Sequence, residues 1–317
     1  MESQQPKEFF HASILLEQCL AALQIKPDGV YIDATLGGAG HSLAIARQLA
    51  AGGRLICIDR DDDALENAKT RLAPVMERVT LVKSDFRALD NALAAQGLDG
   101  ADGILFDLGV SSPQLDQAAR GFSYMQDAPL DMRMDRTQAL TAAEIVNTWE
   151  KDALRKVLFE YGEERYAPLI AAAIVRRREQ SPIQTTGELV QVIRQAMPAA
   201  GLREKQHPAK RTFQAIRIAV NDELGAVREA MDKAIAALHP GGRLAVITFH
   251  SLEDRIVKEA FRQAAQGCTC PRDFPVCVCG KKPQVKIMTR KPIMPGAGEI
   301  QDNARARSAK LRVCEKL

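Results

Sequence analysis

The stretch Asp33-Ala-Thr-Leu-Gly-Gly-Ala-Gly-His41 decides the fold class. It follows a short apolar run at residues 29–33 and precedes a helical pattern at 42–49. Glycines let a backbone approach a ligand closely, and the first N–H groups of a helix are free to meet an anion. Strand, glycine-rich turn and helix in this order predict a nucleotide-type site at the carboxyl edge of a parallel sheet.

The glycine-rich turn alone is a weak signal, because a purely structural turn has the same composition. The dinucleotide fingerprint G-x-G-x-x-G is not met, since Leu43 stands at its third glycine position. The case for a ligand therefore depends on the rest of the sheet.

Four further apolar runs are typical of buried strands. With the first, the predicted strands are residues 29–33, 54–59, 79–83, 103–107 and 243–248. Helical patterns at 42–49, 64–72 and 88–96 separate the early strands. Strand and helix alternating at this spacing predict right-handed crossovers, and hence an α/β fold with a mostly parallel sheet.

The gap of about 135 residues between the fourth and fifth strands is too long for one crossover. Capping-box patterns begin at Thr141 and Thr185, and residues 163–178 and 208–238 carry apolar residues at helical spacing. These features predict an all-helical domain, residues 113–211, inserted into a split sheet domain of residues 1–112 and 212–317. One helix near 211–238 is expected to return the chain to the fifth strand.

Acidic residues stand at the ends of the predicted strands. Asp59 ends the second strand about 20 residues beyond the glycines, where a carboxylate can accept both ribose hydroxyls. Asp85 and Phe86 follow the third strand and offer a polar group beside an aromatic face suited to adenine, and Asp107 ends the fourth. Because the carboxyl ends of parallel strands share one edge, these residues predict a bound nucleoside-type cofactor.

Charge is distributed unevenly along the chain. The net charge of +3 combines −9 over residues 1–150, +6 over 151–217, −1 over 218–250 and +7 over 251–317. Two basic segments suggest a polyanionic partner, although solvated helix faces would give the same count. The N-terminus lacks the pattern of a secretory signal, and no apolar run reaches the roughly 20 residues of a membrane span. We therefore expect a cytosolic protein.

The segment after the fourth strand, Leu108-Gly-Val-Ser-Ser-Pro-Gln-Leu115, is similar to the Ser/Asn/Asp-Pro-Pro-aromatic motif of amine methyltransferases, with Gln114 at the second proline. Taken together, the chain closely resembles the ribosomal small subunit methyltransferase H family, the bacterial 16S rRNA cytidine-N4 methyltransferases. The matching runs are His11 with Ile14-Leu-Leu-Glu17, residues 33–41 and 107–116, Arg120-Gly-Phe-Ser123, Pro129-Leu-Asp-Met-Arg-Met-Asp135, Tyr161-Gly-Glu-Glu-Arg165, Arg211-Thr-Phe-Gln-Ala-Ile-Arg217, residues 249–258 and Ala304-Arg-Ala-Arg-Ser-Ala-Lys310.

The resemblance implies a Rossmann-like methyltransferase with S-adenosyl-L-methionine as cofactor and a cytidine in the decoding centre of 16S rRNA, in the small ribosomal subunit, as substrate. The family's cofactor contacts fall on Ala39, Gly40, His41, Asp59, Phe86, Asp107 and Gln114. Ala39 replaces a glycine of other members, so its contact is expected through backbone. No general base carries over. The oligomeric state stays open, with a homodimer as one option.

Two other classes of function share some of these sequence features. An NAD-dependent oxidoreductase is disfavoured by the missing third glycine and the lack of a hydride-transfer constellation. The second class is a non-catalytic RNA-binding protein that kept a cofactor pocket. Only a measurement of methyl transfer distinguishes it from an RNA methyltransferase.

The cysteines bear on the chemistry. The seven are Cys19, Cys57, Cys268, Cys270, Cys277, Cys279 and Cys314, and none lies in the segment after the fourth strand. Methylation of cytosine at carbon 5 normally needs a cysteine nucleophile, whereas amine methylation needs none. We therefore expect N4 methylation, with Asp107, Ser111, Ser112 or loop carbonyls as candidate acceptors for the amine hydrogens. No metal ligand is assigned, and for the four clustered cysteines a structural zinc site and reduced thiols both stay open.

Overall fold

The computed structural model describes residues 13–268, 270 and 278–317. His11 and Cys277 therefore lie outside the described residues. The chain forms two compact units. Unit 1 comprises residues 1–108 and 228–317, and unit 2 is the continuous segment Gly109–Val227.

Unit 1 is built on a sheet that, within the described residues, has seven strands in the order β3-β2-β1-β4-β5-β7-β6. The first five strands pair in parallel, while β7 pairs antiparallel with both β5 and β6. This confirms the α/β class and the mostly parallel sheet. The strands are β1 (Val30–Asp33), β2 (Arg54–Asp59), β3 (Val79–Lys83), β4 (Ala101–Asp107), β5 (Leu238–Thr248), β6 (Val285–Ile287) and β7 (Lys310–Lys316).

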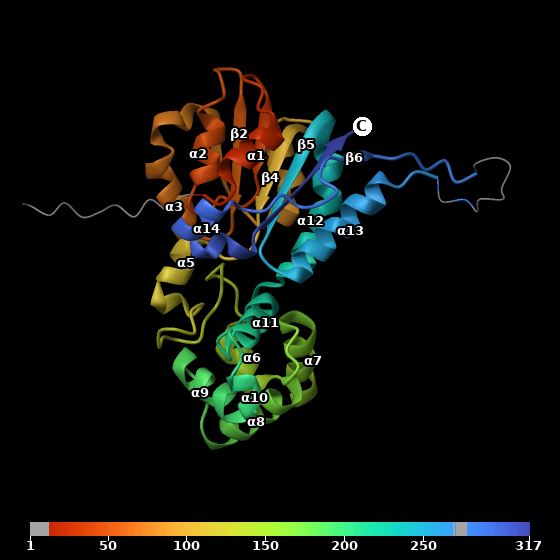
Figure 1. Cartoon of the computed structure of the whole chain (residues 1–317). Coiled ribbons are helices and arrows are strands. Elements are labelled where there is room, and N and C mark those ends of the chain that lie inside the picture. Colours follow the sequence, from red (N-terminus) through yellow and green to blue (C-terminus); the bar gives the residue numbers. More distant parts are fainter. Residues whose placement is uncertain (1–12, 269, 271–277) are drawn as a thin grey trace, which may run out of the picture. The chain divides into compact units, whose positions relative to one another are not determined.

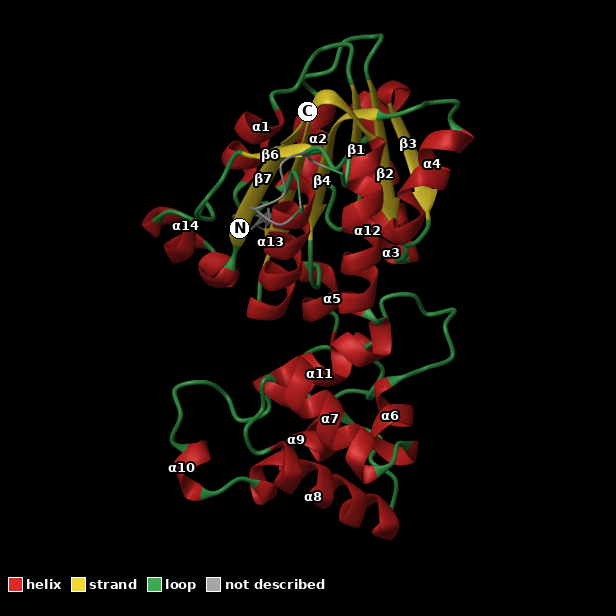
Figure 2. Cartoon of the chain, turned by 90° about the vertical axis from the view of Figure 1, so that its right-hand side faces the viewer, coloured by secondary structure: helices red, strands yellow, loops and turns green. Residues whose placement is uncertain are grey.

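Helices lie on both faces of this sheet (Figures 1 and 2). The helices of unit 1 are α1 (Leu16–Leu23), α2 (Gly40–Ala46), α3 (Asp62–Arg71), α4 (Leu89–Ala95), α12 (Glu223–Ala237, whose first turn belongs to unit 2), α13 (Ser251–Ala265) and α14 (Ala297–Asp302), with 3-10 turns η1 (Ala73–Arg78), η2 (Phe86–Ala88) and η4 (Ala304–Ser308). Buried side chains of α1, α2 and α3 share one apolar cluster with those of β2, β4, β5 and β7. Burial on both faces explains why these strands are nearly continuous apolar runs.

Unit 2 consists of helices and irregular segments. Its elements are α5 (Ser112–Asp116), η3 (Ala118–Arg120), α6 (Ala142–Thr148), α7 (Lys151–Gly162), α8 (Ala167–Gln180), α9 (Thr186–Ala196), α10 (Ala199–Leu202) and α11 (Lys210–Asn221). Thr141 and Thr185 cap α6 and α9 as the sequence predicts. The unit has its own core, to which α11 contributes Phe213 and Ile216. This packing is why the unit extends to Val227, 16 residues beyond the bound expected from the sequence.

Three elements differ from the sequence prediction. The helix expected at 163–178 is the shorter α8, because Glu163 takes a left-handed conformation (φ 48°) and ends α7. The single helix expected near 211–238 is broken into α11 and α12 at Asp222, which is also left-handed (φ 45°). Strands β6 and β7 were not predicted at all.

Among the described residues, no helix has both the length and the apolar content needed to cross a lipid bilayer.

Candidate active site

The glycine-rich turn connects β1 to α2 at the carboxyl edge of the sheet. Asp33, the last residue of β1, is buried and accepts hydrogen bonds from the Ser42 hydroxyl (2.5 Å) and the Thr35 N–H (3.2 Å). Gly37 and Ala39 both have positive φ, 47° and 59°. For Ala39 this conformation is unusual and consistent with a position that prefers glycine. The carboxylate of Asp33 thus ties both the start of the turn and the first turn of α2 to the end of β1.

Asp59 ends β2 beside this turn. Its Oδ2 accepts a hydrogen bond from the Gly37 N–H (2.8 Å), and its Oδ1 accepts one from the Asp61 N–H (2.9 Å). Burial raises the pKa of Asp59 to about 6, although these two N–H donors act against the increase. Each carboxylate oxygen keeps further lone-pair capacity, so the group can accept ribose hydroxyls while it anchors the turn.

Asp107 ends β4, with its N–H donating to Thr35 Oγ1 (2.6 Å). Its Oδ2 lies 3.6 Å from Nδ1 of His41, while its Oδ1 is buried and has no hydrogen-bond partner among the described residues. Burial raises the pKa of Asp107 to about 6 against the opposing pull of His41. A buried carboxylate oxygen without a partner is costly, so it points to a donor supplied by a ligand.

The ring of His41 is fixed from its other side. Its Nε2 lies 3.1 Å from the carbonyl oxygen of Ile14, which can only accept, so Nε2 carries a proton. The ring of His41 is therefore held between the carbonyl oxygen of Ile14 and the carboxylate of Asp107.

Phe86 follows β3 and lies next to β4. Asp85 caps η2 by accepting a hydrogen bond from the Arg87 N–H (2.9 Å), which places Phe86 at the start of that turn. The Phe86 ring packs edge-on against the buried Phe106 ring, with centroids 5.5 Å apart and planes at 83°. Phe86 itself is half-buried, so part of its ring stays open to a planar ligand.

Ser111, Ser112 and Gln114 belong to unit 2, at the start of α5. The Ser111 hydroxyl accepts a hydrogen bond from the Gln114 N–H (3.4 Å), and the Gln114 carbonyl oxygen Oε1 accepts one from the Ser111 N–H (3.1 Å). The two side chains thus form a capping box, a local structural role that the sequence reasoning did not foresee. Contacts of Gln114 with the cofactor and of the serines with the substrate remain predictions.

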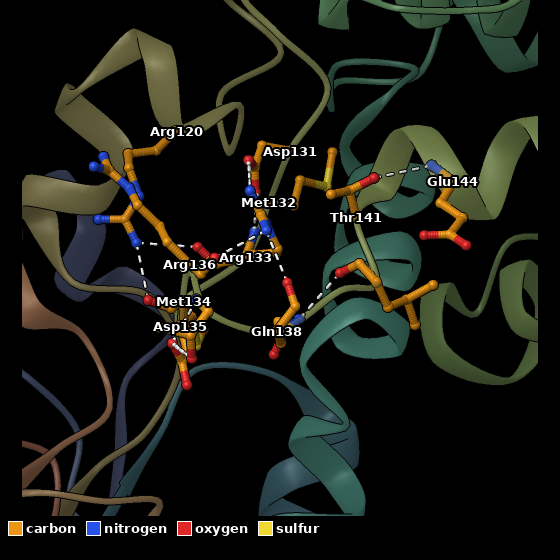
Figure 3. Close-up of polar contacts among 12 residues, drawn as sticks. Arg120, Asp131, Met132, Arg133, Met134, Asp135, Arg136, Gln138, Thr141 and Glu144 are labelled. Atoms are coloured by element: carbon orange, nitrogen blue, oxygen red, sulfur yellow. Dashed lines mark hydrogen bonds and ion pairs between the residues drawn. The ribbon is translucent and has the colours of Figure 1, made fainter.

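A polar network in unit 2 was also missed. Figure 3 shows Arg133 paired with Asp131 through two bonds of 2.8 Å, and Arg120 donating to the carbonyls of Arg133 (3.0 Å) and Met134 (3.1 Å). Asn221, at the end of α11, accepts from the Met134 N–H (2.9 Å) and donates to the Met132 carbonyl (2.8 Å). The one sequence feature that could have indicated this network is the unusual composition of residues 129–135. The network holds this segment in one shape.

The described structure therefore brings six of the seven predicted cofactor residues to one edge of one sheet: Ala39, Gly40, His41, Asp59, Phe86 and Asp107. A glycine-rich turn after β1, acids after β2 and β4 and an aromatic ring after β3 define a Rossmann-like domain for a nucleoside-type cofactor. The sheet is completed by the antiparallel β7, which lies between β5 and β6.

Comparison with known proteins gives the family. The sequence model of the MraW methylase family matches residues 8–317, and the chain belongs to that family. It is 58% identical to ribosomal RNA small subunit methyltransferase H of Brevibacillus brevis, over 98% of both chains. It is 57% identical to the protein of that name from Paenibacillus sp., over 98% of this chain and 100% of the relative. S-adenosyl-L-methionine is accordingly the cofactor.

The chain also aligns with solved structures at low sequence identity. NSun6 from Pyrococcus horikoshii with SFG aligns with a TM-score of 0.44 and 16% identity, covering 100% of this chain and 56% of that one. An rRNA methylase from Streptococcus thermophilus aligns with a TM-score of 0.41 and 12% identity, covering 95% and 93%.

Proposed function

We propose that this protein transfers a methyl group from S-adenosyl-L-methionine to the N4 exocyclic amine of a cytidine in the decoding centre of 16S rRNA. Membership of the MraW methylase family carries the methyl transfer. Identity of 57–58% with two proteins named ribosomal RNA small subunit methyltransferase H supports the small ribosomal subunit as partner. A ribosomal substrate also fits a cytoplasmic location.

The state of the cysteines favours the amine over carbon 5 of the base. Cys19, Cys57 and Cys314 are buried. Burial raises the pKa of the Cys57 and Cys19 thiols well above the usual value, and that of Cys314 to about 12. A thiol held neutral is a poor nucleophile. None of these three described cysteines is suited to attack carbon 6 of a cytosine, as methylation at carbon 5 requires.

The chain's own residues would hold the cofactor and orient the amine. The bound sulfonium supplies an activated methyl group, so the protein has mainly to align donor and acceptor, which can contribute roughly 7–11 kcal/mol. Asp59 would accept the ribose hydroxyls, Phe86 would pack against adenine, and the backbone at Ala39 and Gly40 would approach the ligand. His41, Asp107 and Gln114 complete the proposed cofactor set.

The amine needs acceptors for its two hydrogens, because its lone pair is delocalised into the ring. The unpartnered Oδ1 of Asp107 is one such acceptor. We propose Ser111 and Ser112, which follow Asp107 in the sequence by four and five residues, as the others.

Methyl transfer from labelled cofactor to small subunits, followed by nucleoside analysis of the digested RNA, tests this proposal. We expect N4-methylcytidine. A 5-methylcytidine product would overturn the mechanism, and binding of the cofactor without any transfer would favour the non-catalytic alternative.

Serine variants test the amine contacts. Ser111→Gly and Ser112→Ala should slow transfer more than they weaken cofactor binding, and glycine at the cap position of α5 costs only a few tenths of a kcal/mol. Thr141→Gly removes the equivalent hydroxyl from the cap of α6 and serves as the matched control. If the control slows transfer as much as Ser111→Gly, the hydroxyl of Ser111 has no special role.

A further inference from the structure

Three cysteine side chains gather between α13 and β6. The Sγ atoms of Cys268, Cys270 and Cys279 all lie within 4.8 Å of one another, although Cys279 is 11 residues away from Cys268 in the sequence. The Sγ atom of Cys279 is 3.7 Å from that of Cys268. This cluster lies in unit 1 and is separate from the residues assigned to the cofactor.

The spacing of the sulfurs matches a shared cation better than a disulfide. A disulfide bond measures about 2.0 Å. Two thiolates bound to one tetrahedral zinc at about 2.3 Å stand about 3.8 Å apart, which agrees with the distance between Cys268 and Cys279. In addition, the N–H of Cys270 points at Sγ of Cys268 at 3.4 Å.

The surrounding segment has little else to fix its shape. Residues 278–284 are exposed, and Val278 is 73% exposed despite being apolar. The N–H of Gln284, just before β6, donates a backbone hydrogen bond to the carbonyl oxygen of Ala264 in α13 (2.8 Å). A segment that buries so little apolar surface needs another source of stability to stay ordered, and a bound metal supplies it.

We propose that Cys268, Cys270 and Cys279 bind one structural zinc ion, which links the residues that follow α13 to the residues that precede β6. Three soft thiolates select zinc among the common divalent ions, and the site needs no redox chemistry. Each thiol gives up its proton to solvent as its sulfur binds the metal, so affinity should fall as the pH is lowered. Cys277 lies outside the described residues, and the proposal depends on the other three.

Metal analysis of the full chain, purified without chelators, tests the site directly. We expect about one zinc per chain, and loss of it in Cys270→Ser and in the double variant Cys268→Ser/Cys279→Ser. Val278→Ser changes an exposed neighbour of Cys279 and should keep the metal. Cobalt added in place of zinc should give a thiolate-to-cobalt absorption band. A reduced wild-type chain that holds no zinc and gives no such band would overturn the proposal, as would a double variant with full zinc content.

Limited proteolysis tests the structural role separately. Trypsin can cut after Lys281, which is exposed two residues beyond Cys279, but not after Lys282, because Pro283 follows it. Removing the metal with a chelator should speed cleavage there in the wild type but not in the double serine variant. Equal cleavage rates with and without metal would show that zinc does not order the residues around Lys281. Neither readout depends on methyl transfer.

Discussion

At the scale of single residues, Asp59 and Asp107 at the ends of β2 and β4 lie in buried surroundings that disfavour the ionised carboxylate. Burial raises the pKa of both Asp59 and Asp107 to about 6. In the unfolded chain both titrate near 3.8, so between these values the folded chain binds more protons than the unfolded chain. The stability contributed by each group is therefore present at low pH and is lost as the pH rises towards 6.

Replacing Asp107 with asparagine should therefore stabilise the cofactor-free protein at pH 8. We expect a gain on the order of 1 kcal/mol in the free energy of unfolding, discounted because the Asp107 side chain is 27% exposed. The gain should shrink as the pH falls to 4, where the wild-type carboxyl is neutral. Urea denaturation at several pH values measures it.

Asp102→Asn is the control with the opposite sign. Burial works against ionisation there too, but the Lys26 ammonium and the Val30 N–H outweigh it and lower the pKa of Asp102. That variant should lose stability at pH 8. If Asp107→Asn destabilises the chain to the same extent, the charge of Asp107 is satisfied in the folded state and our account of its environment fails.

Cofactor affinity should show the functional side of Asp59. Asp59→Ala should weaken binding of S-adenosyl-L-methionine by roughly ten- to a hundred-fold, because a charge-assisted hydrogen bond contributes about 1.5–3 kcal/mol. Wild-type affinity should also fall below pH 6, as the carboxyl becomes protonated. Calorimetry measures both, and unchanged affinity in a folded Asp59→Ala would remove this residue from the site.

Spacing along the chain made some of these residues predictable and hid others. Asp59 and Asp107 could be found because a strand end is visible as the last residue of an apolar run. The capping role of Gln114 was also readable, because Ser111-x-x-Gln114 is a capping-box pattern. The pairing of Arg120 with the carbonyls of residues 133 and 134 could not be predicted, because it depends on how a loop folds back on itself. Patterns of apolar residues carry no information on such contacts.

At the scale of elements, a glycine sets how closely two helices of unit 2 approach. A Cβ atom at Gly162, the last residue of α7, would lie 2.6 Å from the carbonyl oxygen of Arg211 in α11. The neighbour is backbone and cannot move aside cheaply. Gly162→Ala should therefore lower the free energy of unfolding by about 1–3 kcal/mol, which urea denaturation would reveal.

Gly298→Ala is the matched control, because a Cβ atom at this position of α14 meets nothing within 4 Å. Alanine should stabilise that helix by about 0.5–1 kcal/mol. A Gly162→Ala protein as stable as the wild type would mean that α7 and α11 are not in tight contact.

The elements missed from the sequence share one property. All five predicted strands are confirmed, and all but the edge strand β3 are largely buried and therefore apolar almost throughout. In β7, by contrast, Lys310, Arg312 and Glu315 interrupt the apolar positions, and Arg312 is buried only through its pairing with Asp254 (2.6 Å). A partner 58 residues away in sequence cannot be read from local composition. The break at Asp222 was equally hidden, because helical periodicity continues on both sides of it.

At the scale of the whole molecule, the basic segments 151–217 and 251–317 are the proposed grip on phosphates. Apparent affinity for RNA should fall steeply with salt, by about 0.7–0.9 log units per log unit of salt for each phosphate contact. Folded small subunits should be better substrates than a short unstructured oligonucleotide. Binding that is insensitive to salt, or equal rates on the two substrates, would contradict this.

Two arginines of α8 sharpen that test. Arg176 is exposed, whereas Arg178 donates hydrogen bonds to the carbonyls of Val146 (3.0 Å) and Trp149 (2.7 Å). Arg176→Gln should reduce the salt dependence of RNA binding by up to one phosphate contact and leave stability unchanged. Arg178→Gln should act mainly on stability.

In the sequence, unit 2 stands between β4 and β5. The ribosome therefore completes unit 2 before it completes the sheet of unit 1. A nascent chain completed as far as Val227 contains all of the helical unit but only β1 to β4 of the sheet. The free edge of β4 then has no partner until β5 emerges from the ribosome, and β5 in turn waits for β7. Unpaired edges of this kind invite association between chains. Fragments that stop within or just after unit 2 should therefore aggregate, although they already carry every residue assigned to the cofactor.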